Sequence, residues 1–386
     1  MAGLVQVAAV LGLSSPVSTV HGNFVWTPTH AEPPPKAIVH FLGGAFFGAV
    51  PQVAYGEMLQ RIAKQGYIVV ATPFALRFDY EELCTDILST FGPAYETLHK
   101  EHGQLPLLGV GHSAGALLHS IICSACRGGG GAGDVPRLGN VLISFNNKRA
   151  VDAIPLFDQL VGPAASSLLF LQQVVQNAPG GWLGVSLQSE LRRRLEQDIA
   201  PKAAGKINLG QPPRTAAETI DRTLSEFVAL VPQLLPFTDQ IEPILQEVNE
   251  GASEFKPPPD AVRDLVRRLY AAHRTLVISF DNDSLDESGD LMDMIQLDRN
   301  VQLITCTGNH LTPLQAVDEE RFDEFAARVQ TLSLADTSPF FNGLRQPFRL
   351  SGKDFDESLD AALQFLNDCV TAEHGESERL GECADL

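Results

Sequence analysis

Basic residues are scarce in this chain of 386 residues, which has 28 lysines and arginines against 47 aspartates and glutamates. The formal net charge is therefore −19. Nucleic acids and anionic membrane surfaces bind proteins through basic patches, so the acidic balance argues against both as main partners. The sequence also lacks an apolar run of the roughly 18 residues that a membrane-spanning helix requires. We therefore expect neither a nucleic-acid partner nor a transmembrane segment.

The six cysteines are scattered, and although Cys123 and Cys126 form a C-x-x-C, no second cysteine or histidine pair stands at the spacing of a zinc site. The glycine-rich segment 127–133 lacks the lysine and the serine or threonine of a phosphate-binding loop. The sequence thus predicts no disulfide framework, no metal and no cofactor. No Asp, Glu, Lys or Arg precedes Glu32, so the N-terminus has no clear targeting peptide. We expect residues 1–22 to form a flexible N-terminal segment.

Short apolar runs alternate with helical patterns in the first part of the chain, which is typical of a parallel sheet wrapped by helices. The later segments Thr275–Phe280 and Val301–Cys306 continue this pattern. We expect an α/β fold in which residues 23–149 and 256–370 form the core. The other predicted strands are Asn23–Trp26, Ala37–Phe41, Tyr67–Ala71, Leu105–Val110 and Val141–Phe145, and the predicted helices include 52–65, 80–102, 317–334 and 354–370.

Residues 150–255 interrupt the strand–helix alternation. They show helical periodicity with proline breaks and no convincing strand, which predicts a helical cap insertion. The run of lysine and three prolines at 256–259 would close this insertion as a stiff linker. Residues 371–386 are rich in acids and are expected to form a solvated tail.

A G-x-S-x-G pattern at 111–115 follows an apolar strand and opens a helical segment. This is the context of a nucleophile elbow, in which a sharp turn exposes the serine and leaves room only for small neighbours. Ser113 is therefore the candidate nucleophile. His112 lies next to it, and we expect it to serve in packing or in support of the site.

A serine needs a base and an orienting acid, which in this architecture follow it in the order acid, then histidine. Asp283 lies in a turn-rich loop after one late strand, and His310 follows the next late strand. Asp283 is the preferred acid, with Asp281 and Asp286 as alternatives on the same loop.

Acyl transfer also needs donors for the developing oxyanion. The loop after the strand at 37–41 offers the backbone N–H of Gly44 or Ala45, and the helix after the serine offers that of Ala114. Polar residues after the strand at 141–145 could bind a substrate group or cap the insertion, and the sequence leaves both options open. They are Asn146, Asn147 and Lys148.

Several runs of this sequence resemble a family of cyanobacterial and chloroplast proteins known as domain of unknown function 1350. These runs, within residues 20 to 320, are AIVHFLGGAFFGAVPQVAY, GYIVVATPF, GVGHSAGALL, VLISFNNK, AIPLF, LVISFDNDSLDES and GNHLTPL. The family is placed in the α/β-hydrolase superfamily. The resemblance implies that fold, an elbow serine at Ser113 and a later histidine at His310. It also implies a plastid location.

Two hypotheses for the function follow. The first is a serine hydrolase that acts on a small-molecule or lipid-like acyl ester or thioester, with the helical insertion as a lid. The second is a non-catalytic binding or assembly protein of the same fold, associated with photosynthetic complexes. Because function depends on the site and not on the fold, only the site can distinguish them.

Overall fold

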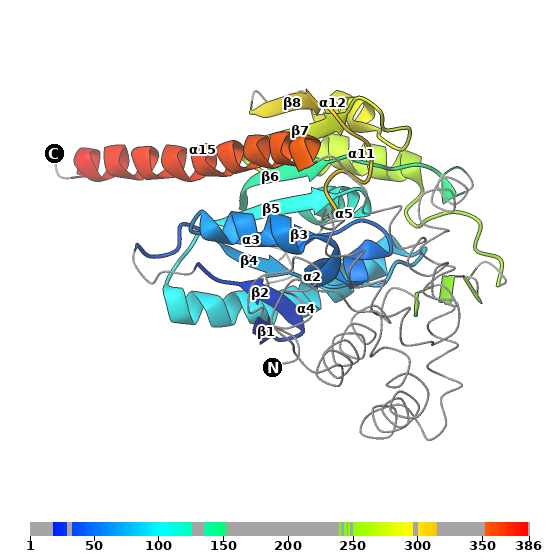
Figure 1. The fold of residues 1–386 in the computed structure, drawn as a ribbon, viewed down its shortest axis with the longest axis horizontal. Coiled ribbons are helices and arrows are strands. Elements are labelled where there is room, and N and C mark those ends of the chain that lie inside the picture. The colour runs from blue at the N-terminus through cyan, green and yellow to red at the C-terminus, as the bar shows by residue number, and fades with distance from the viewer. Residues whose placement is uncertain are drawn as a thin grey trace, which may run out of the picture. The chain divides into compact units, whose positions relative to one another are not determined.

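The computed structural model describes residues 18–28, 33–125, 135–150, 250–295, 300–314 and 352–384, together with 152, 239–240, 243–244 and 246–247. Within these ranges eight strands form one sheet in the order β1-β2-β4-β3-β5-β6-β7-β8 (Figure 1). The strands are β1 (Ser18–Val20), β2 (Asn23–Trp26), β3 (Ile38–Leu42), β4 (Ile68–Ala71), β5 (Leu107–His112), β6 (Arg137–Ile143), β7 (Thr275–Phe280) and β8 (Val301–Cys306).

The sheet is mostly parallel. All neighbouring pairs from β4 to β8 are parallel, whereas β2 pairs antiparallel with both β1 and β4. β3 and β5 are buried along their whole length, which explains why both appear in the sequence as nearly continuous apolar runs. This topology, with helices on both faces, confirms the predicted α/β-hydrolase fold.

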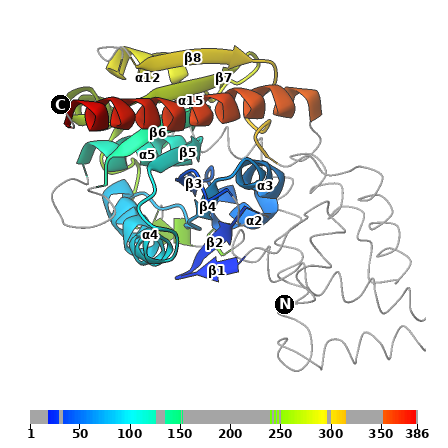
Figure 2. The same cartoon turned by 90° about the vertical axis from the view of Figure 1, so that its left-hand side faces the viewer.

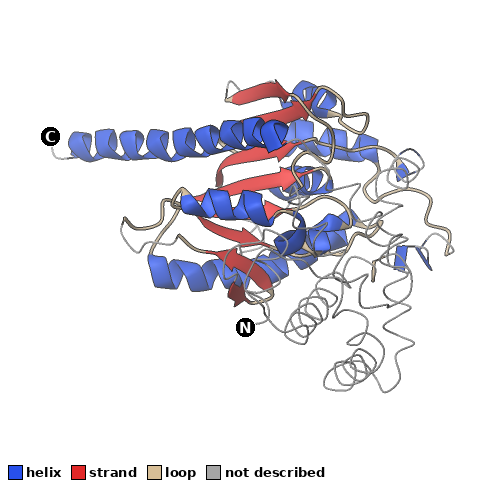
Figure 3. Cartoon of the chain, viewed as in Figure 1, coloured by secondary structure: helices blue, strands red, loops and turns tan. Residues whose placement is uncertain are grey.

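Helices cover both faces of the sheet (Figures 2 and 3). On one face, Arg61 of α3 forms ion pairs with Asp356 and Asp360 of α15. α4, α5, α11 and α12 lie on the other face and contact one another in sequence order. The described helices are α2 (Pro51–Ala54), α3 (Gly56–Lys64), α4 (Tyr80–His102), α5 (Ala114–Ala125), α11 (Pro259–Leu269), α12 (Ser288–Ile295), α15 (Gly352–Ala384) and the 3₁₀ helix η1 (Phe47–Ala49).

α4 illustrates how local sequence sets the bounds of an element. The carboxylate of Asp79 caps its start by accepting the N–H of Glu82 at 2.9 Å. The helix ends at Gly103, whose φ of 83° is left-handed and suits glycine. These signals explain why the predicted helix over 80–102 matches α4.

Several boundaries differ from the prediction; both ends of β3 and β5, the start of β4 and the end of β6 shift by one or two residues, and four differences are larger or change the assignment. β1 lies inside the segment 1–22, so the sheet begins at Ser18, and of this segment residues 1–17 lie outside the described part. The predicted helix over 52–65 is divided at Tyr55 into α2 and α3. β6 begins at Arg137 because that side chain and Asn140 are buried with polar partners inside the sheet. The predicted tail is helical through Ala384, as part of α15.

Other predictions lie outside the described residues. They concern the loop at 127–133, nearly all of the insertion at 150–255 and the helix at 317–334. Near its end, the insertion is described at residues 239–240, 243–244, 246–247 and 250–255. Its closing segment is fixed to the core, because Lys256 N–H donates to Phe78 O at 2.8 Å and Lys256 O accepts the N–H of Tyr80. Among the helices that the structure describes, none has the length and apolar character needed to cross a membrane.

Candidate active site

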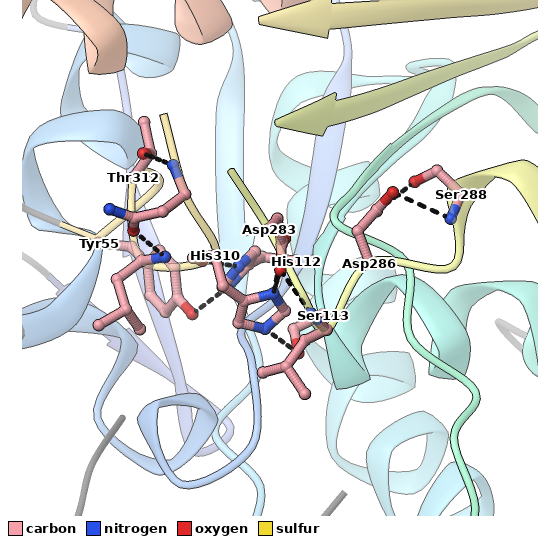
Figure 4. Close-up of polar contacts among 11 residues, drawn as sticks. Tyr55, His112, Ser113, Asp283, Asp286, Ser288, His310 and Thr312 are labelled. Atoms are coloured by element: carbon pink, nitrogen blue, oxygen red, sulfur yellow. Dashed lines mark hydrogen bonds and ion pairs between the residues drawn. The ribbon is translucent and has the colours of Figure 1, made fainter. Parts of the chain in front are cut away.

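The loops that follow β3, β5, β6, β7 and β8 meet at one edge of the sheet, because carboxyl ends of parallel strands point the same way. This edge holds the residues on which the predicted chemistry depends. Figure 4 shows Ser113, Asp283 and His310 side by side at this edge.

The turn between β5 and α5 has the geometry of a nucleophile elbow. Ser113 adopts a left-handed φ of 54°, which is unusual for a residue with a side chain. Its N–H donates to Ile143 O at 2.8 Å, which holds the turn against β6. A Cβ on Gly115 would lie 2.1 Å from Leu42 O, so only glycine allows α5 to approach β3 this closely. The elbow therefore depends on tight backbone packing on both sides.

The serine, histidine and acid form a continuous chain of hydrogen bonds. His310 Nε2 lies 2.9 Å from Ser113 Oγ. His310 Nδ1 lies 2.8 Å and 3.1 Å from the two carboxylate oxygens of Asp283. All three residues come from different loops, and the side chains of His310 and Asp283 are 5% and 0% exposed. Water is thus excluded from the histidine–carboxylate contact.

The charge of Asp283 fixes the direction of these bonds. Burial alone would raise the pKa of this carboxyl, but the hydrogen bond and the charge of His310 outweigh it and hold the pKa below its ordinary value. An ionised carboxylate only accepts hydrogen bonds, so Nδ1 of His310 carries a proton. In the neutral imidazole, Nε2 then accepts a hydrogen bond from the hydroxyl of Ser113. This is the arrangement that activates a serine.

The two alternative acids have other partners. Asp281 accepts the N–H of Gly308 at 3.0 Å and so fixes the loop that carries the histidine. Asp286 accepts the N–H and the hydroxyl of Ser288 at the start of α12. Burial, with a further contribution from the negative charge of Asp283, raises the pKa of Asp286 to about 6. Of the three candidates, only Asp283 contacts His310.

The candidate oxyanion donors differ in availability. The N–H of Gly44 donates to the hydroxyl of Tyr55 at 2.8 Å, so the expectation that Gly44 supplies a free donor is not met. In the described part of the chain, the N–H groups of Ala45 and Ala114 have no hydrogen-bond partner. These two groups therefore remain the candidates for an oxyanion site.

The polar residues after β6 mainly hold neighbouring segments together. Asn147 donates its N–H to Glu287 at 2.8 Å and its side-chain amide to Pro259 O at 3.0 Å. Lys148 Nζ lies 3.6 Å from Glu287. Asn146 differs, because its amide nitrogen is buried and has no partner among the residues described. Asn147 and Lys148 thus tie the acid loop to α11, and only Asn146 keeps a free polar group.

Two further side chains, Tyr55 and His112, form hydrogen bonds at the site, and the sequence did not predict these bonds. Tyr55 Oη lies 2.8 Å from His112 Nδ1, and His112 Nε2 lies 2.9 Å from the backbone oxygen of His310. No local pattern points to Tyr55, because its contacts depend on the break between α2 and α3 and on residues far along the chain. His112 was recognisable only as a neighbour of the serine.

Within the described ranges no three His, Cys, Asp or Glu side chains are grouped so that they could hold an ion. The residues at the carboxyl edge of the sheet can instead activate a hydroxyl and stabilise a nearby negative charge.

Solved structures that resemble this chain include several hydrolases. Esterase B from Lactobacillus rhamnosis is 14% identical, with 92% of this chain and 83% of that chain covered and a TM-score of 0.43. A protein from Acinetobacter baumannii described as a "putative lipase" is 15% identical, with 86% and 96% covered and a TM-score of 0.40. The thioesterase domain of the curacin biosynthetic pathway is also 15% identical, with 83% and 99% covered and a TM-score of 0.38.

A search of curated proteins found no match. Residues 17–174 and 221–330, by contrast, match a protein family, and together these ranges span well over half of the chain. The gap between them falls inside the expected cap insertion. The chain therefore belongs to the family described as "Protein of unknown function (DUF1350)".

Proposed function

We propose that this protein is a serine hydrolase that cleaves an acyl ester or thioester. Ser113 is the nucleophile, His310 the general base and Asp283 the acid that orients the histidine. The observation that carries the proposal is the unbroken series of hydrogen bonds from Ser113 Oγ through the imidazole to the buried carboxylate. A purely structural role would not require a strained serine at the start of this series.

The reaction follows from the direction of these bonds. Ser113 Oγ attacks the acyl carbon while its proton passes to Nε2 of His310, and Asp283 stabilises the imidazolium that forms. The N–H groups of Ala45 and Ala114 stabilise the negative charge on the former carbonyl oxygen. The bond to the leaving group then breaks, and the leaving group takes the proton from Nε2. Water repeats the sequence in the second half and releases the acid.

The substrate is a small or lipid-like acyl compound in this proposal. The leucine, valine and phenylalanine content of residues 150–255 favours an apolar acyl part, with this insertion acting as a cap over the site. The buried amide of Asn146, which has no partner among the described residues, offers a donor to a polar group of the substrate.

We also propose a plastid location on the family resemblance alone, which microscopy of a fluorescent full-length fusion in a photosynthetic cell would test.

Labelling with a fluorophosphonate probe tests the proposal. We expect the wild-type protein to be phosphonylated at Ser113 and Ser113→Ala to be unlabelled. Ser89→Ala is the matched control, because Ser89 is an exposed serine of α4 that bonds only within its helix. Mass spectrometry of the labelled peptide identifies the site. Folded wild-type protein that resists several such probes would favour the non-catalytic binding or assembly role.

A further inference from the structure

Tyr55 and His112 are buried beside the candidate site, yet the proposed reaction uses neither side chain. Tyr55 lies at the junction of α2 and α3, and His112 is the last residue of β5. Figure 4 shows the Tyr55 hydroxyl directed at His112. Together the two side chains connect two backbone groups: the N–H of Gly44 in the loop after β3 and the carbonyl oxygen of His310 in the loop after β8.

The polarity of this connection is fixed by its two ends. A backbone carbonyl can only accept, so His112 Nε2 must carry the proton that is donated to His310 O. A backbone N–H can only donate, so Tyr55 Oη accepts from Gly44. The hydroxyl proton of Tyr55 is then free to point at Nδ1 of His112, which accepts it if the imidazole is neutral.

The environment of His112 keeps its imidazole neutral. Its ring is enclosed on all sides, and burial, with a further contribution from the neighbouring His310, lowers its pKa to about 3. The series therefore runs in one direction only, from Gly44 N–H through Tyr55 and His112 to His310 O. Each member has a single partner on each side, so no second arrangement satisfies all four groups.

Tyr55 and His112 also lie against the loop that carries Ala45, the candidate oxyanion donor. The peptide group between Gly44 and Ala45 is held at its oxygen, which accepts the N–H of Gly48 at 2.6 Å. In a trans peptide the N–H points opposite to the oxygen, so the N–H of Ala45 points away from Gly48. A Cβ on Gly44 would lie 3.1 Å from His112 Nδ1 and 3.3 Å from both Tyr55 Oη and Ser113 Cβ, which shows how closely this loop passes the serine.

We propose that Tyr55 and His112 are positioning residues that set the oxyanion loop and the backbone of His310 relative to each other. Tyr55 fixes the peptide of Gly44 that precedes the donor Ala45. His112, held in one tautomer by Tyr55, fixes the main chain that carries the general base. This inference rests on the proposed function, since it concerns the base and the oxyanion donor of that reaction.

Tyr55→Phe is the main test, because it removes only the hydroxyl and leaves the ring in place against Phe41. We expect the rate of phosphonylation, and kcat with any ester substrate, to fall about 10- to 100-fold, with KM changed less than threefold. Tyr270→Phe is the matched control. It also removes a tyrosine hydroxyl with two hydrogen bonds, to Asn140 and Thr275, but at the opposite edge of the sheet, and its rate should stay within twofold of wild type.

A second pair of variants tests His112 itself. The amide nitrogen of glutamine reaches about as far as Nε2, whereas that of asparagine does not. His112→Gln should therefore keep at least ten times the phosphonylation rate of His112→Asn. In ¹⁵N spectra of the wild type, the His112 ring should show the neutral tautomer with the proton on Nε2 from pH 5 to 8.

The outcomes separate the two proposals. Wild-type protein that no probe labels would overturn the serine hydrolase and this inference with it. A labelled wild type whose folded Tyr55→Phe variant reacts at the same rate would overturn this inference alone. If Tyr55→Phe does not fold, equal rates for the two His112 variants, or a charged or Nδ1-protonated His112 at pH 7, would overturn it as well.

Discussion

At the scale of single residues, the loop after β7 carries three carboxylates with three different partners. Asp283 contacts the imidazole of His310, whereas Asp281 and Asp286 bind backbone and hydroxyl groups. Asp283→Asn should lower the turnover of a p-nitrophenyl acyl ester roughly 10⁴-fold, because the imidazolium loses its charge partner and the histidine its required tautomer. Asp281→Asn and Asp286→Asn should each cost about tenfold or less.

These three variants must be compared as folded proteins, since the loop also ends a buried strand. Circular dichroism and urea unfolding provide that control. Near-normal turnover in Asp283→Asn together with loss in one of the other two would assign the acid elsewhere on the loop.

The raised pKa of Asp286 predicts a pH dependence of stability. In the unfolded chain this carboxyl titrates near its ordinary pKa of about 4, and in the folded protein near about 6. Between these values the folded state binds more protons, so its contribution to stability is full below about pH 4 and is lost as the pH rises to about 6. Asp286→Asn should flatten this slope and gain about 1 kcal/mol at pH 7, after allowance for the carboxyl's partial exposure.

Urea unfolding of wild type and variant at pH 4, 5, 6 and 7 measures this difference. Parallel curves for the two proteins across the whole range would contradict the prediction. The sign matters, because an acid whose folded pKa lay below 4 would give the opposite slope.

At the scale of elements, the elbow depends on the close approach of α5 to β3. Gly115→Ala would place a methyl group 2.1 Å from Leu42 O, a backbone atom that cannot rotate away. We expect a loss of about 3 kcal/mol in the free energy of unfolding, from overpacking. Gly289→Ala in α12 is the control, since a Cβ there meets nothing within 4 Å, and it should be neutral or stabilising by up to about 1 kcal/mol.

Guanidinium unfolding of wild type and both variants measures these differences in the free energy of unfolding. A Gly115→Ala protein as stable as wild type would mean that β3 and α5 can move apart without cost. The elbow would then be more plastic than its contacts indicate.

Elements were predictable where their sequence is locally consistent. The bounds of β2, β7 and β8 match the predicted strands, because apolar or β-branched runs end at turn residues. The start of β6 was missed since Arg137 and Asn140 look like surface residues. Their burial depends on His40, Tyr270 and other partners from distant segments.

In the candidate site, too, some features could be predicted from local sequence and others depend on contacts between distant segments. Ser113, Asp283 and His310 could be selected from their positions after strands, and the structure brings them into contact. The use of the Gly44 N–H by Tyr55 could not be predicted, because it needs the relative placement of two loops. The sequence could favour Asp283 only by its position on the loop; the hydrogen-bond partners that distinguish it from Asp281 and Asp286 come from other segments of the chain.

At the scale of the whole molecule, described residues in or next to the insertion lie near the carboxyl edge of the sheet. Arg149 follows β6 at the carboxyl edge of the sheet, and Gln240 donates to Phe46 O and accepts the N–H of Leu76, both at 2.9 Å. Phe46 directly follows the candidate donor Ala45. Gln240, near the end of the insertion, thus contacts the segment next to the oxyanion loop, and we expect residues 157–239 to determine the choice of substrate.

Replacing residues 157–239 with a short glycine–serine linker tests this expectation. The replacement keeps Gln240 and Glu247, which hold Leu76 and Phe78. We expect the preference among esters of two to sixteen carbons to shift by at least tenfold, while fluorophosphonate still labels Ser113. An unchanged chain-length profile would argue against a cap function.

The large separation of the proposed triad residues along the chain has a consequence for the time at which they meet. Ser113 lies 197 residues before the histidine that it contacts. At a synthesis rate of about 5 to 20 residues per second, roughly ten to forty seconds pass between the two on the ribosome. If His310 is the base, as proposed, the serine has no base during that interval, so a nascent or prematurely ended chain that lacks residue 310 carries the elbow sequence but cannot attack an acyl group. In the proposed mechanism, the order of the three residues thus delays reactivity until residue 310 has been synthesised.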